Sequence, residues 1–420
     1  LVATTACSTD KILKVSRPDI IDPNGLSDAN GVSALYAGVI GDFSSTNAAA
    51  LGVITATGFM SDEFKFGATP PEARQMDQRA APESNTIVAT IYRNVQQLRG
   101  QADRAATALK SVRANDPRVG EMEAMSGYAH IILGEMFCSG SPLGLPGEDA
   151  DPQTTTQLFT AAAAKLASAV TNAAGDDRAK NFASVLRGRA LLNLATSQAQ
   201  FDQAAAAVAS VPTSFRYTTL HSTTTPAQNN GLANYMNNND GILVSDREGG
   251  NGLNFATAGD PRVPITGNGA PSRFDGQTPR YYYANASSLT SPMPIATGVE
   301  ARLIEAEAAL RASNITLWVN KLNEARAFYG MGQVSDPGTT DPNARVNLMF
   351  RERAFSMFAS AHRLGDLRRL VRQYGRAATS VYPTGAYHKD GLQLGTDVQF
   401  VIPQTEKNNP KFTGCIDRNA

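Results

Sequence analysis

Residues 155–198 read TTQLFTAAAAKLASAVTNAAGDDRAKNFASVLRGRALLNLATSQ, and this stretch decides the fold class. Its first part, residues 155–172, is dense in alanine and is typical of a helix. Its second part, residues 178–198, places apolar side chains at helical spacing, namely Phe182, Val185, Leu186, Ala190 and Leu194. Because alanine lets two helices approach closely, we expect the two parts to pack as an antiparallel hairpin.

The same pattern continues outward in both directions along the chain. Residues 87–109 carry one apolar stripe, formed by Ile87, Ile91, Val95, Leu98, Ala102, Ala105 and Leu109. A second helix follows Asp116-Pro117, with its stripe at Met122, Met125, Ala129, Ile132 and Met136. Further helices are predicted at 27–44 (with Ser27 or Asp28 as N-cap), 201–210, 298–311 and 315–329, and a single long helix at 345–374.

Helix pairs that bury their stripes against the next pair are the principle of tetratricopeptide-type arrays. The strict 34-residue period of that repeat is absent, so the repeats are degenerate and interrupted. We therefore predict an all-α, tetratricopeptide-like scaffold of helical hairpins, with pairs at about 84–210 and 298–375 and a C-terminal tail at 376–420.

The segment from 211 to 297 differs from the helical parts. It is rich in Thr, Asn, Gly and Pro and has no helical period. Such a long irregular run is either disordered or a functional excursion packed on the scaffold. Its scattered aromatic and aliphatic residues, among them Phe215, Tyr217 and Phe255, favour a packed, loop-rich insert.

Composition excludes several classes of protein. The chain has 38 Lys+Arg and 38 Asp+Glu, so its formal net charge is zero and a nucleic-acid partner is not expected. No window has the roughly 18–20 unbroken apolar residues of a membrane span. Three cysteines at distant positions do not form a zinc motif, and we expect neither a metal nor a cofactor.

No catalytic constellation is visible in the sequence. The four histidines lie outside any HExxH motif, and neither a GxSxG motif nor a phosphate-binding loop occurs. Arg363, Arg368 and Arg369 could form an anion or carboxylate site. A structural pin, in which Arg363 and Asp366 pair with each other or with neighbouring helices, is favoured. Glu305 and Glu307 point to different helix faces and are also expected to be structural.

Six motifs in a fixed order resemble one family. They are GEMEAMSGYAHIILGEMFCSGSPL (120–143), DPRVP (260–264), ARLIEAEAALR (301–311), LNEARA (322–327), RERAFSMFASAHRLGDLRR (351–369) and FVIPQTEKNNP (400–410), after an N-terminal cysteine with a polar tail. Each motif alone is weak, but the ordered set, which covers roughly residues 16–412, is similar to SusD/RagB-like proteins. In the long helix the family's two glutamates are replaced by Ser356 and Ser360.

The resemblance implies a non-enzymatic surface lipoprotein of the outer membrane. Such proteins capture oligosaccharides or peptides and deliver them to a SusC-type TonB-dependent transporter. Residues 1–15 are then a signal-peptide remnant and tether with Cys7 as the lipid anchor, and residues 16–420 form one SusD-like domain. Thr4 stands where leucine is commonest in a lipobox. The alternative is a structural or self-assembling surface or extracellular protein on the same scaffold.

Two further sets of residues carry specific predictions. If Cys7 is acylated, Cys138 and Cys415 remain as a candidate disulfide; the alternative is two unpaired thiols. Tyr281, Tyr282 and Tyr283 are candidate ligand-binding residues, because sugar rings stack on aromatic faces. An ordinary edge strand explains these tyrosines equally well, whereas Trp318 is expected in the core.

Overall fold

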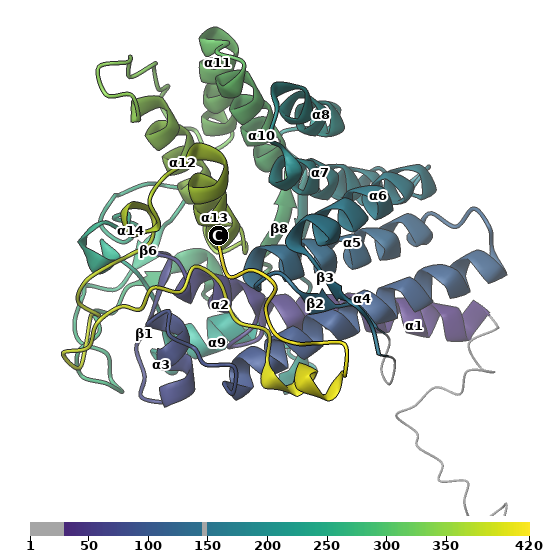
Figure 1. The fold of residues 1–420 in the computed structure, drawn as a ribbon, viewed down its shortest axis with the longest axis horizontal. Helices are drawn as coiled ribbons and strands as arrows, with labels where there is room; N and C mark the ends of the chain where they lie inside the picture. The colour runs from purple at the N-terminus through teal and green to yellow at the C-terminus, as the bar shows by residue number, and fades with distance from the viewer. Residues whose placement is uncertain (1–28, 145–148) are drawn as a thin grey trace, which may run out of the picture.

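The computed structural model describes residues 29–144 and 149–420, and within them the protein is mainly helical (Figure 1). Four helices form two antiparallel hairpins and a fifth helix extends them: α4 (Thr86–Val112), α5 (Arg118–Met136), α6 (Thr155–Asn172), α7 (Asp177–Leu194) and α8 (Gln198–Val208). A third hairpin consists of α10 (Gly298–Arg311) and α11 (Ile315–Ala327). The predicted all-α, tetratricopeptide-like fold is confirmed.

Local sequence signals set where these helices begin. Thr154 and Gln157 form a capping box at the start of α6, and the Asp176 side chain accepts a hydrogen bond from the Ala179 amide at the start of α7. Asn85 caps α4 in the same way. Each cap gives a partner to amide groups that the first turn of a helix leaves unpaired.

A seam of glycines brings α5 against α6. A Cβ atom added at Gly120 would lie 2.4 Å from the Ala173 amide nitrogen, and one added at Gly127 would lie 2.6 Å from Leu166 Cγ. Gly134 faces the Phe159 ring in the same manner. These glycines are seven residues apart, so they share one helix face, and α6 packs directly on the α5 backbone.

The insert between the hairpins is packed onto the scaffold, with Phe255 and Tyr217 in the core. Besides 3₁₀ turns, the insert contains one short helix and several short strands in antiparallel pairs. These are β4 (Arg216–Thr218) with β8 (Pro294–Thr297), β5 (Ile242–Val244) with β1 (Phe64–Phe66), β6 (Ile265–Thr266) with β7 (Tyr282–Tyr283), and α9 (Gly231–Asn237). The expectation of a packed, loop-rich insert therefore holds. Of its short elements, a strand at the tyrosines of β7 was one expected alternative, and the others were not predicted.

The prediction of one long helix at 345–374 is wrong. The chain forms α12 (Ala344–Ser356) and α13 (Arg363–Tyr374), separated by a turn in which Ala359 and Ala361 have φ angles of 54° and 62°. The Ala359 amide donates to Glu63, and the Ala361 carbonyl accepts from Arg189. These contacts with distant segments hold a left-handed backbone that the local sequence does not favour.

The remaining elements are short helices, strands and turns outside the hairpins, and the N-terminal helix α1. They are α1 (Ala29–Ala48), α2 (Val53–Phe59), α3 (Pro71–Asp77), α14 (Ala378–Val381), the pair β2 (Ser141–Pro142) and β3 (Pro152–Gln153), and short 3₁₀ turns at Pro226–Gln228, Glu248–Gly250, Ala284–Ala286 and Gln404–Asn408. The predicted caps Ser27 and Asp28 lie outside the described residues. Trp318 is buried in a cluster shared by α10, α11 and α12, as expected. Of the helices in the described part of the chain, none is long and apolar enough to cross a membrane.

Candidate functional site

Three arginines on α12 and α13, namely Arg353, Arg363 and Arg369, belong to a buried ionic network. Arg363 donates to Asp62 at 2.6 Å and 2.9 Å, and Arg369 contacts Glu307 at 2.5 Å and Asp366 at 2.8 Å. Arg353 completes the set by donating to Asp366. Arg363 and Asp366 are thus pinned to neighbouring elements rather than to each other, and these arginines are already neutralised by protein carboxylates.

The remaining titratable candidates are also structural. His362 is buried, and its Nε2 lies 2.9 Å from a Glu300 carboxylate oxygen. Glu305 pairs with Arg302 and Lys321, whereas Glu307 pairs with Arg369, so the two glutamates serve different contacts. Across the described ranges no group of three or more His, Cys, Asp or Glu side chains is placed to hold a metal ion.

The three candidate tyrosines do not form one platform. The Tyr282 hydroxyl donates to Asp240 at 2.8 Å in a half-buried position, and Tyr281 is also half-buried. Tyr283 is buried, with its ring edge-on to Phe358 at a centroid distance of 5.0 Å. Tyr282 and Tyr283 form the short strand β7, so the edge-strand interpretation describes their backbone. Their role in ligand binding stays a prediction.

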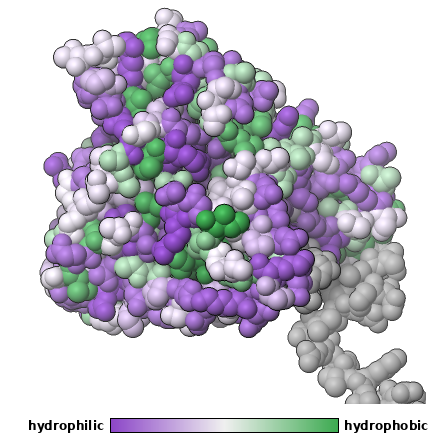
Figure 2. Space-filling view, in the orientation of Figure 1, coloured by the Kyte–Doolittle hydropathy of each residue, from purple (hydrophilic) through white to green (hydrophobic). Residues whose placement is uncertain are grey.

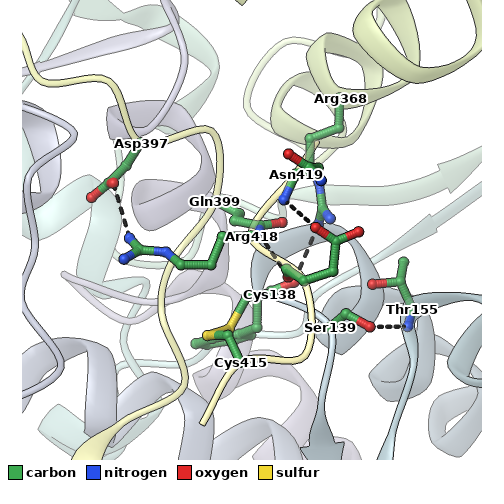
Figure 3. The surroundings of a disulfide bond; sticks show 11 residues. Cys138, Ser139, Thr155, Arg368, Asp397, Gln399, Cys415, Arg418 and Asn419 are labelled. Carbon is green, nitrogen blue, oxygen red and sulfur yellow. Dashed lines mark hydrogen bonds and ion pairs between the residues drawn. A yellow bond between two sulfur atoms is a disulfide. The ribbon is translucent and has the colours of Figure 1, made fainter.

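A disulfide joins Cys138, just after α5, to Cys415 in the C-terminal segment, with Cα atoms 5.7 Å apart. Figure 3 shows the bond between the end of α5 and the tail, where Ser139 and Arg368 lie on one side and Arg418 on the other. The Ser139 amide also donates to the Asp417 carbonyl, and the Ile416 amide donates to the Ser139 carbonyl. This is the pairing expected from the sequence. Cys7 lies outside the described residues.

One open site in the described part of the chain is a groove along α4. It has a volume of about 810 Å³ and lies between the outer face of α4, the loop at Pro142–Gly144 and the C-terminal turn Gln404–Asn408. The Gln404 amide donates to the Glu83 carbonyl, which fixes this turn against the start of α4. In Figure 1 the C-terminal turn, in yellow, lies below α4. We call this site the α4 groove.

Planar polar side chains line the α4 groove. Gln96 donates to the Pro142 carbonyl at 2.6 Å and accepts from Arg99, whose Nη2 donates to the Gly144 carbonyl at 2.9 Å. This chain of bonds holds the floor of the groove in one conformation. Burial lowers the pKa of the Arg99 guanidinium. Tyr92, the one aromatic residue among the described lining residues of the groove, is buried and offers no open face for stacking.

The side chains of Arg93, Gln97 and Gln101 face the same groove and make no hydrogen bond with any residue in the described ranges. Amide groups donate and accept hydrogen bonds in a plane, and guanidinium groups donate them in a plane, which suits a ligand rich in hydroxyl or peptide groups. The arrangement can therefore bind a polar ligand through hydrogen bonds.

The fold is that of the SusD superfamily, as the motif order implied. A SusD superfamily protein from Parabacteroides distasonis superposes with a TM-score of 0.67 and 11% identity, over 92% of this chain and 98% of that one. A laminarin-binding SusD-like protein gives a TM-score of 0.68 and 14% identity, over 93% and 99%. A SusD-like carbohydrate-binding protein from Bacteroides vulgatus gives 0.60 and 12%, over 80% and 82%.

The likeness is one of structure rather than of sequence. No protein-family model matches this chain, and no curated protein matches it either. Sequence reasoning did not find the α4 groove. Its residues occupy the polar face of an amphipathic helix, and every such helix has a polar face, so no local signal marks this one as a binding surface.

Proposed function

We propose that this chain is a surface-exposed nutrient-binding lipoprotein, not an enzyme. It captures oligosaccharides or peptides and delivers them to a SusC-type TonB-dependent transporter in the outer membrane, with Cys7 as its lipid anchor. The α4 groove carries the binding part of this proposal, because its unpaired amide and guanidinium groups suit polar ligands. Support for the choice of glycans comes from the carbohydrate-binding and laminarin-binding proteins of the same fold.

The groove is tested by isothermal titration of the purified chain with a panel of neutral oligosaccharides, β-glucans included, and neutral peptides. Replacement of Gln97 or Gln101 by alanine should weaken binding of the selected ligand roughly three- to tenfold each, the effect of one lost hydrogen bond. Gln203→Ala, an exposed glutamine on α8, is the matched control and should bind like the wild type. Equal affinities in all three variants would place the ligand elsewhere.

Delivery and anchoring need a separate experiment in native membranes. The chain should co-purify with a TonB-dependent transporter after mild detergent extraction, and mass spectrometry should find an acylated N-terminal peptide that begins at Cys7. A mature chain that begins at Leu1 would exclude the anchor. Ordered assemblies of the isolated protein, seen by microscopy without ligand or transporter, would favour the self-assembling alternative instead.

A further inference from the structure

A second large pocket opens beside the disulfide, and it differs from the α4 groove in its chemistry. It has a volume of about 840 Å³ and lies between the start of α6, the end of α7, the face of α13 and the tail at 416–420. Figure 2 shows this side of the molecule, hollowed and largely hydrophilic between the lobe of α11 and α12 and the helices to its right. We call it the α13 pocket.

Three arginines line the α13 pocket: Arg311, Arg368 and Arg372. None of them forms an ion pair with a carboxylate among the residues described, unlike their neighbours Arg363 and Arg369. Arg311 instead lies over the rings of Phe201 and Tyr374, with centroid distances of 5.0 Å and 5.3 Å. The pocket therefore gathers positive charge that the protein itself does not neutralise by pairing.

Arg368 is the deepest of the three and is only 2% exposed. Its Nη1 donates to the carbonyls of Gly134 and Phe137 at the end of α5, whereas its buried Nε has no partner. Burial lowers the pKa of its guanidinium. Figure 3 shows the side chain reaching down from α13 toward the tail and the end of α5.

Arg372 lies one turn further along α13 and reaches solvent. Its Nη2 donates to the Asn193 carbonyl and side chain, both at 3.3 Å, at the end of α7. Partial burial, together with the charges of Arg368 and Arg369, lowers the pKa of Arg372 to about 10. Like charges one turn apart on a helix repel each other, and a bound anion would relieve this repulsion.

The negative charges around the pocket do not balance these arginines. The carbonyl ends of α5 and α7 contribute roughly half a unit each, since a helix dipole concentrates about that charge at its C-terminus. Asp417 is the carboxylate side chain in the lining, and it is exposed. Among the side chains that line the pocket, one carboxylate thus faces three arginines, two on α13 and one at the end of α10.

The opposite wall carries neutral hydrogen-bonding groups. Thr156 and Thr160 at the start of α6 and Thr196 and Gln200 after α7 face the pocket. Hydroxyl and amide groups suit a chain of sugar hydroxyls, and the apolar lining residues Phe159, Leu194 and Ile416 suit the C–H faces of the sugar rings. A ligand that matches both walls has hydroxyls on one side and a carboxylate on the other.

We propose that the α13 pocket binds acidic oligosaccharides, with a uronate carboxylate held by Arg372 and by Arg368, which lines the inner part of the pocket. Arginine suits this role because its planar guanidinium can bond both oxygens of a carboxylate. The site is separate from the α4 groove and does not depend on the function proposed for that groove.

The test is isothermal titration of the full chain with trigalacturonate and with its fully methyl-esterified, neutral form. Wild type should bind the acid at least about tenfold more tightly than the ester, since charge-assisted bonds are roughly twice as strong as neutral ones. This preference should shrink as salt rises, because ions screen the attraction. Equal affinities for acid and ester, or no binding of either, would overturn the proposal.

Variants assign the effect to the pocket. Arg372→Gln should remove most of the preference for the acid, Arg372→Lys should keep a large part of it, and melting temperatures verify that both variants fold. Arg376→Gln, beyond the end of α13 and outside the pocket, is the matched control. If Arg372→Gln and Arg376→Gln lost the preference for the acid equally, the assignment to the pocket would be wrong. Tighter binding of a triglutamate peptide than of trigalacturonate would also contradict it.

Discussion

Asp62 shows what a single residue contributes to this protein. Its carboxylate accepts two bonds from Arg363 and a third from the Leu253 amide, all in the buried interior. Asp62→Asn leaves the Arg363 charge buried without its partner, so the free energy of unfolding should fall by about 3–5 kcal/mol. Urea denaturation followed by circular dichroism measures this loss.

The exposed pair of Glu83 and Lys407, whose side chains are 49% and 55% exposed, provides the control for that measurement. Glu83→Gln should cost no more than about 1 kcal/mol, because water and salt screen a surface ion pair. Losses of similar size in the two variants would show that the Asp62 pair is not a structural pin.

Glu63, the next residue, makes the stability of the fold depend on pH. Burial raises the pKa of its carboxyl from 4.5 to about 8. Between these two pH values the carboxyl is protonated in the folded protein and ionised in the unfolded chain. This contribution to stability is complete below about pH 4.5 and is lost as pH rises through 8.

Glu63→Gln removes the titrating group while keeping a polar side chain of the same shape. The variant should therefore gain stability relative to wild type as pH rises from 5 to 8.5, by roughly 2–4 kcal/mol over that range. Denaturant titrations at several pH values measure the difference, and parallel stability curves for the two proteins would contradict it.

The sequence predicted that Arg363 and Asp366 are structural, but it could not predict their partners. Asp62 and Arg363 are separated by 301 positions in the chain, and nothing local marks Asp62 as the residue that Arg363 needs. The same limit applies to Arg368 and Arg369, adjacent in sequence. Arg369 is neutralised by Glu307, whereas Arg368 caps the end of α5 and faces a pocket.

At the scale of whole elements, the helix hairpins were predictable because their apolar stripes and caps are local signals. The break between α12 and α13 was not, because no proline or glycine marks it. Hydrogen bonds with Glu63 and Arg189 hold Ala359 and Ala361 in the left-handed backbone conformation there. Alanine richness led to the expectation of close helix contacts, but the contact between α5 and α6 depends on the glycines of α5.

The glycine seam predicts that two glycine-to-alanine substitutions change stability in opposite directions. Gly127→Ala places a methyl group 2.6 Å from Leu166 Cγ, and this overlap should destabilise the fold by about 1–3 kcal/mol, less the gain in helix propensity. Gly38→Ala on α1 meets nothing within 4 Å, so it should stabilise by up to about 1 kcal/mol. Thermal unfolding compares the two, and shifts of the same sign would argue against the seam.

For the whole molecule, the disulfide is the longest covalent constraint, with its cysteines 277 positions apart. Replacing Cys138 and Cys415 together by serine should lower the free energy of unfolding by roughly 3–5 kcal/mol, since the cross-link restricts the unfolded chain. A thiol titration in denaturant should find two more reactive thiols after reduction than before. An unchanged count would show that the bond does not form.

The same bond has a consequence for biosynthesis. During synthesis Cys138 emerges long before Cys415, and in the finished fold it is fully buried at the end of α5. The hairpins can form while this thiol is still free, but the bond must wait for the last stretch of the chain to cross the scaffold. A free Cys138 thiol therefore indicates a molecule whose C-terminal segment is not yet bound to the helical scaffold. Loss of that thiol indicates that the disulfide to Cys415 has formed.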